Sequence, residues 1–160
     1  MTGIETVDMV EGLVRLTHPA VVICVDSLAA RDAARIGTTL QLTDTGIQPG
    51  AGVGNRRQPL TAERLGVPVI AIGMPTVIYA ATLARDAFEW LGRQDGRAEA
   101  DEAALYDMER SLLSADIGEM IVTPREIDTL IQDAAGIIAG AVNRALQPEL
   151  TDQDIAVMMD

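Results

Sequence analysis

The sequence predicts an α/β fold of three layers, in which a mostly parallel sheet is flanked by helices. Residues 20–25 and 67–72 are continuous apolar runs, the first rich in β-branched side chains. Such runs are typical of parallel strands that are buried on both faces. Segments of helical periodicity alternate with these runs, and this alternation favours a layered α/β architecture.

The first half of the chain contains two helices and two strands by these criteria. An amphipathic pattern over 4–16 predicts a helix that His18-Pro19 ends. The strand at 20–25 follows, and an Ala-rich helix is expected from Ser27 to about Ile36. A second strand is expected over 38–43, where apolar and polar residues alternate.

The second half begins with the strand at 67–72, a turn at Gly73-Met74-Pro75 and a helix from Thr76 to Leu91. The last helix is expected over 124–145, because Thr123-Pro124-Arg125-Glu126 has the pattern of a capping box with Pro at the first helical position. The length of 160 residues fits one domain, which we place at 1–148, followed by an acidic tail at 149–160.

The charge balance argues against direct binding to nucleic acid. There are 12 basic and 24 acidic residues, for a net charge of −12, and this surface would repel phosphate backbones. The uncharged stretch 65–84 is long enough to suggest a membrane span, but Pro68, Gly73 and Pro75 interrupt it, so we expect no membrane association. The single cysteine, Cys24, and the absence of a signal-peptide pattern indicate a cytoplasmic, reducing compartment.

Asp26 is the strongest candidate for a catalytic residue. It directly follows an apolar strand, and open α/β folds place their sites at the carboxyl ends of strands. The N–H groups of the helix expected after it would favour the ionised carboxylate, which suits a general base or a metal ligand. An N-cap or turn role is the alternative, although Ser27 is also available as a cap.

The glycine-rich segment that follows the second strand is the candidate substrate loop. It runs through Asp44, Thr45, Gly46, Gly50, Gly52, Gly54 and Asn55. It lacks the spacing of a phosphate-binding loop, so the glycines are better explained by close approach of a substrate chain or a neighbouring loop. With one histidine and one cysteine in the chain, a zinc site is not expected, and no other metal or cofactor is predicted.

Several segments, in order along almost the whole chain, resemble the spore germination proteases. The matching stretches are Thr2–Thr6, Val25–Arg31, Thr43–Arg56, Leu65–Val77 and Val122–Asp128. The resemblance implies an endopeptidase of the spore core, made as a zymogen, that degrades small acid-soluble spore proteins during germination. It also implies a homo-oligomer and a fold similar to that of the hydrogenase maturation peptidases.

The resemblance implies an aspartate pair, of which this chain carries one member. Val25-Asp26-Ser27-Leu28 matches the segment with one aspartate, so Asp26 takes the catalytic role by analogy. The other belongs to an Asn-x-Thr-Pro-Asp segment, which is absent here. The chain thus resembles the C-terminal half of a longer protease, and we expect it to be inactive alone. Two alternatives remain: a non-catalytic remnant or interaction domain, and a metal-dependent maturation-type peptidase with Asp26 as ligand.

Overall fold

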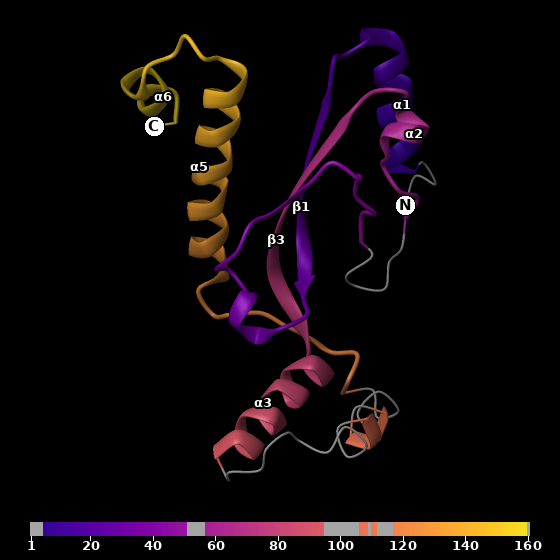
Figure 1. Ribbon diagram of the computed structural model, residues 1–160, viewed down its shortest axis with the longest axis vertical. Helices are drawn as coiled ribbons and strands as arrows, with labels where there is room; N and C mark the ends of the chain where they lie inside the picture. Colours follow the sequence, from indigo (N-terminus) through magenta and orange to yellow (C-terminus); the bar gives the residue numbers. More distant parts are fainter. Residues whose placement is uncertain (1–4, 51–56, 95–105, 109, 112–116, 160) are drawn as a thin grey trace. The chain divides into compact units, whose positions relative to one another are not determined.

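The computed structural model describes residues 5–50, 57–94, 106–108, 110–111 and 117–159. The chain divides into two compact units, Met1–Thr123 and Pro124–Asp160 (Figure 1). The first unit contains the whole described sheet. Its elements are α1 (Thr6–Thr17), β1 (Val22–Ala30), the 3-10 turn η1 (Ala33–Arg35), β2 (Gln41–Thr43), α2 (Ala62–Leu65), β3 (Val69–Tyr79), α3 (Ala80–Gln94) and β4 (Ile121–Val122). The second contains α5 (Ile127–Leu146) and α6 (Asp152–Met159).

The sheet is built around β3, and the predicted α/β class is confirmed. The strand order is β1-β3-β2, and β4 also pairs with β3. The long pair β1/β3 is parallel, as expected from the two apolar runs, and Figure 1 shows these strands side by side. The short strands β2 and β4 run antiparallel to β3, so the sheet is mixed.

The prediction of a helix from Ser27 to about Ile36 is wrong. β1 instead continues through Asp26 to Ala30, because residues 26–30 pair with β3 over residues 73–78. Long-range pairing here outweighs the helix propensity of the alanines. Only the short η1 follows, and the helix N-terminus expected next to Asp26 is replaced by continuing strand.

The turn expected at residues 73–75 is also wrong, because β3 runs through it to Tyr79 and α3 begins only at Ala80. Pro75 is accommodated in β3 opposite Leu28, next to a shift of register between Leu28 and Ala29. Proline lacks a backbone N–H and is tolerated in sheets at such irregularities. The Pro75 carbonyl accepts a hydrogen bond from the Gly37 N–H at 2.8 Å.

The core of the first unit lies where α1, α2 and the start of β3 meet. Its buried members are Val7, Leu60, Leu65 and Val69, with Cys24 and Ile47 packed against them among others. The helix predicted over 4–16 is thus confirmed as α1. The expected burial of the strands on both faces is met in part. Residues 73–76 of β3 are all buried, whereas Val25 of β1 and Ile70 of β3 are 59% and 36% exposed.

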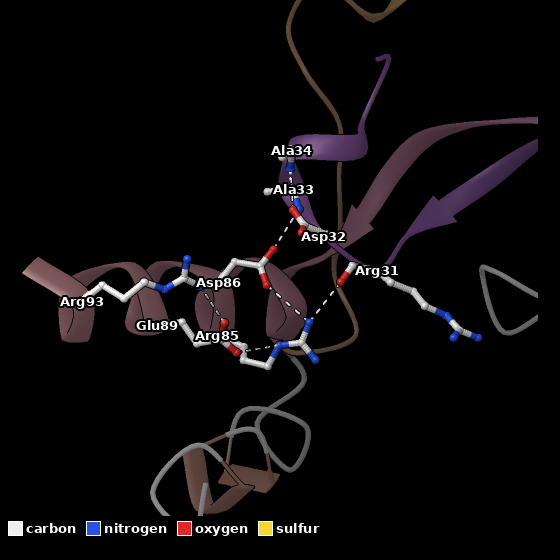
Figure 2. A network of polar contacts seen from close by, with 8 residues as sticks. All are labelled: Arg31, Asp32, Ala33, Ala34, Arg85, Asp86, Glu89 and Arg93. Atoms are coloured by element: carbon white, nitrogen blue, oxygen red, sulfur yellow. Dashed lines mark hydrogen bonds and ion pairs between the residues drawn. The ribbon is translucent and has the colours of Figure 1, made fainter. Parts of the chain in front are cut away.

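A polar network fastens the segment after β1 to α3 (Figure 2). The Asp86 carboxylate accepts a hydrogen bond from the Ala33 N–H at 2.8 Å, and Arg85 donates to the Arg31 carbonyl at 3.0 Å. Asp32 caps η1 by accepting from the Ala34 N–H at 2.8 Å. These contacts hold the carboxyl end of β1, and with it the strand that carries Asp26.

The second unit is a helical pair. The capping box predicted at residues 123–126 is wrong: α5 begins at Ile127, and the Thr123 hydroxyl instead donates to the Thr76 carbonyl at 2.8 Å. A capping box is formed before α6, where the Thr151 N–H donates to Asp154 and the Asp154 N–H donates back to the Thr151 hydroxyl. None of the helices in the described ranges has the length and apolar character needed to cross a membrane.

Candidate active site

A cleft of about 270 Å³ opens on one face of the sheet, and it contains Asp26. Three parts of the first unit surround it: β1, β2 and the segment after β2, with β3 as the floor. Its lining residues are Asp26, Ser27, Leu28, Gln41, Thr43, Gly46, Ile47, Gln48, Gly50, Ala71 and Gly73. This volume is close to the lower end of the range for small-molecule sites, ~300 Å³. The cleft is therefore large enough for a short segment of a peptide.

Asp26 lies within β1, opposite Gly73 of β3, and its side chain is half-buried. Its carboxylate accepts a hydrogen bond from the Ser27 N–H at 2.9 Å. One oxygen is therefore fixed by the backbone next to it. A carboxylate held in this way at the wall of a cleft can accept a proton from a bound water molecule.

Asp26 also influences Cys24, which precedes it by two residues and lies on the same face of β1. Burial raises the pKa of the Cys24 thiol above its usual value, and the negative charge of Asp26 raises this pKa further. Cys24 packs against the core cluster. Both effects favour the protonated form of the Cys24 thiol.

The segment after β2 is held against residue 60 by a close backbone contact that requires glycine. Gly46 has φ +93°, and a Cβ atom at this position would lie 2.2 Å from the Leu60 carbonyl oxygen. Next to it, Ile47 and Leu60 form an antiparallel bridge with N···O distances of 3.0 and 2.8 Å. Because Ile47 also packs against the core, this contact sets the wall of the cleft opposite β1.

The floor of the cleft is kept low by small residues of β3. Gly73 lies opposite both Asp26 and Gln41, and Ala71 lies opposite Thr43. A Cβ atom on Gly73 would lie 2.4 Å from Leu28 Cδ1, so the absence of a side chain lets Leu28 lean over the strand. The cleft therefore depends on the identity of Gly73 as well as on the strand pairing.

The cleft brings together three of the residues selected from the sequence, namely Asp26, Gly46 and Gly50. Asp44 and Thr45 are exposed and do not line it; the Thr45 hydroxyl instead bonds to that of Thr43 at 2.8 Å. Gly52, Gly54 and Asn55 lie outside the described residues. Catalytic and substrate-binding roles for all of these residues stay predictions.

Sequence reasoning missed the residues that β2 and β3 contribute, above all Gln41 and Gly73. The available signals were a polar residue inside the expected strand 38–43 and two small residues, Ala71 and Gly73, spaced by two. Alternate positions of a strand share a face, so this spacing is consistent with a floor. Among the described residues, no three His, Cys, Asp or Glu side chains cluster as a metal site would require.

Comparison with known proteins identifies the family. A family model described as germination protease matches residues 1–117. Germination proteases of Caldanaerobacter subterraneus subsp. tengcongensis and of Clostridium perfringens are each 42% identical over 97% of this chain, which corresponds to 52% and 51% of their own lengths. The germination protease of Bacillus pumilus is 36% identical over 97% of this chain and 53% of its own length. The chain thus spans about half the length of these curated relatives. With a family model matching most of its residues and these identities over nearly all of it, the chain belongs to the germination protease family.

Proposed function

We propose that this chain contributes one wall of the active site of a germination endopeptidase, with Asp26 as the carboxylate that activates water. The observation that carries the proposal is the position of Asp26 in a cleft formed with the Gly46–Gly50 segment. Membership of the germination protease family supports peptide hydrolysis as the reaction.

The proposed chemistry needs a second carboxyl group in the opposite protonation state. Asp26, ionised, takes a proton from water, whose oxygen bonds to the carbonyl carbon of the substrate. A protonated partner then gives its proton to the leaving nitrogen as the C–N bond breaks. Asp26 is the single acidic side chain among the described residues that line the cleft, and Asp44 is exposed outside it. We infer that the second aspartate comes from sequence outside this chain.

The substrates that we propose are small acid-soluble spore proteins, and the proposed place of action is the cytoplasm of the germinating spore. This rests on the names of the relatives and on the resemblance of the chain to the family. Synthesis as a zymogen and assembly into a homo-oligomer belong to the same proposal. The hydrogenase maturation peptidases remain the proposed structural relatives.

The proposal is tested by incubating purified chain with a small acid-soluble spore protein and identifying fragments by mass spectrometry. We expect no specific fragments from the 160 residues alone, and specific cleavage by a longer form that supplies the second aspartate. Specific fragments from the 160 residues would show that another acid has taken the second role. Absence of cleavage in every form would contradict the proposal and favour a non-catalytic interaction domain.

A further inference from the structure

Three residues from three strands form one row across the sheet at the cleft. Gly73 of β3 is paired with Asp26 of β1 on one side and with Gln41 of β2 on the other. Residues paired across neighbouring strands project on the same face, and all three line the cleft. Asp26 and Gln41 therefore face the same space from opposite walls. Gly73 adds no side chain between them, and the Leu28 side chain leans over Gly73 and forms the floor there.

The width of this row matches an extended peptide. Neighbouring strands are ~4.8 Å apart, so two spacings separate the backbones of Asp26 and Gln41 by roughly 10 Å. A single extended chain occupies about one such spacing. A substrate chain lying over Leu28 and Gly73 would thus have the Asp26 carboxylate on one side and the Gln41 carboxamide on the other.

β2 contributes two polar side chains to the cleft, Gln41 and Thr43, and of these Gln41 is free to hydrogen-bond a ligand. The Thr43 hydroxyl is engaged by Thr45, through its hydroxyl at 2.8 Å and its N–H at 3.1 Å. In the segment after β2, the Gln48 side chain donates to the Arg57 carbonyl at 3.0 Å and so stabilises its own segment. The Gln41 side chain makes no hydrogen bond to any described residue and is exposed to the cleft.

We propose that Gln41 binds the scissile peptide group and donates an N–H to its carbonyl oxygen from the wall opposite Asp26. This inference rests on the proposed function. When the activated water attacks the carbonyl carbon, an electron pair moves onto this oxygen, and a donor already in position stabilises the developing negative charge. Gln41 then acts with Asp26, which takes the proton from water on the other side of the substrate.

The test compares Gln41→Ala and Gln41→Glu in whichever form of the protein cleaves a small acid-soluble spore protein. Both variants lose the donor, and Gln41→Glu keeps the length and shape of the side chain. We expect kcat to fall about 10²- to 10³-fold in both, as for other single donors of this kind, with KM changing far less. Gln132→Ala, an exposed glutamine of α5, serves as the matched control and keeps wild-type kinetics.

Three readouts separate this role from others. Urea unfolding of Gln41→Ala should match wild type, because Gln41 is exposed in a three-residue edge strand. Wild-type kcat in Gln41→Ala, a rise in KM alone, or normal activity in Gln41→Glu would each overturn the inference. Loss of cleavage in Asp26→Asn together with normal cleavage in Gln41→Ala would refute the role of Gln41 alone, whereas normal cleavage in Asp26→Asn would refute both proposals.

Discussion

Leu28 of β1 leans over Gly73 of β3, so that a Cβ atom on Gly73 would lie 2.4 Å from Leu28 Cδ1 and 2.7 Å from its Cγ. Leu28, Gly73 and Asp26 line the same cleft. The packing of Leu28 in the space above Gly73 therefore couples the stability of the β1/β3 pair to the shape of the site. Adding a single methyl group at Gly73 and measuring the change in stability tests this coupling.

We expect Gly73→Ala to destabilise the protein by about 1–3 kcal/mol, the usual cost of overpacking, because Leu28 must leave its position. Urea unfolding followed by circular dichroism measures the change. The matched control is Gly12→Ala in α1, where a Cβ atom has nothing within 4 Å. That variant should gain up to about 1 kcal/mol from helix propensity. Equal effects of the two substitutions would contradict the packing, whereas relief of the cost in Gly73→Ala/Leu28→Ala would support it.

A second pair of glycines distinguishes two reasons why a glycine is required, namely a left-handed backbone conformation and a close contact with another part of the chain. Gly46 and Gly66 both have positive φ, +93° and +73°, but a Cβ atom meets the Leu60 carbonyl oxygen at 2.2 Å only at Gly46, and has open space at Gly66. Gly66→Ala should cost roughly 1–2 kcal/mol from the left-handed conformation. Gly46→Ala should cost clearly more in urea unfolding, because the bridge between Ile47 and Leu60 must also open. A smaller loss for Gly46→Ala than for Gly66→Ala would contradict the close contact.

The reactivity of Cys24 reports on the charge of Asp26 without any assay of proteolysis. Burial and the Asp26 carboxylate both raise the pKa of the Cys24 thiol, so the thiolate forms only at higher pH. Asp26→Asn removes the second cause and leaves the first, so the pKa should fall towards its usual value. The rate of alkylation by iodoacetamide against pH measures this shift. Asp44→Asn is the control and should leave the curve in place, whereas an unchanged curve in Asp26→Asn would contradict the proximity of the two side chains.

The face of the sheet opposite Asp26 is expected to drive self-association. Its exposed apolar side chains are Val25, Leu42 and Ile70, which are 59%, 73% and 36% exposed. Apolar strand surfaces of this kind favour association with another copy, although the net charge of −12 opposes it. Light scattering at micromolar concentration should report a dimer or larger species, and Leu42→Gln should shift it towards the 17.0 kDa monomer. Leu16→Gln, at a leucine of α1 that is 78% exposed, is the control. A monomer in the wild-type chain would contradict this prediction.

The sequence was sufficient where local pattern decides the structure. The periodicity over 4–16 predicted α1, and the apolar runs correctly located the starts of β1 and β3 and their parallel pairing. The ends of these strands were not predictable in this way. Residues 27–30 have the composition of a helix, and Gly73-Met74-Pro75 that of a turn, yet each segment is extended because it pairs with the other.

The residues of the candidate site likewise fall into those that local sequence identifies and those that long-range strand pairing brings in. Asp26 was found because a carboxylate after an apolar run is a local feature, and the glycines at 46 and 50 because they cluster in the sequence. Gln41 enters the site only through the register of β2 with β3, and Gly73 only through the registers of β1 and β2 with β3, which depend on long-range pairing. Asp44 shows the converse: it is close to the loop in sequence, but its side chain is exposed outside the cleft.

Cleavage of a small acid-soluble spore protein by Asp26→Asn, made in a longer form that supplies the second aspartate, is the most direct test of the proposed role of Asp26. The substitution keeps the shape of the side chain and removes its capacity to take a proton from water, so we expect cleavage to fall about 10²- to 10⁴-fold while urea unfolding remains close to wild type. Asp44→Asn, at an exposed carboxylate outside the cleft, should cleave normally in the same assay. Near-normal cleavage by Asp26→Asn would contradict the account, since a water-activating carboxylate could not then reside at this position.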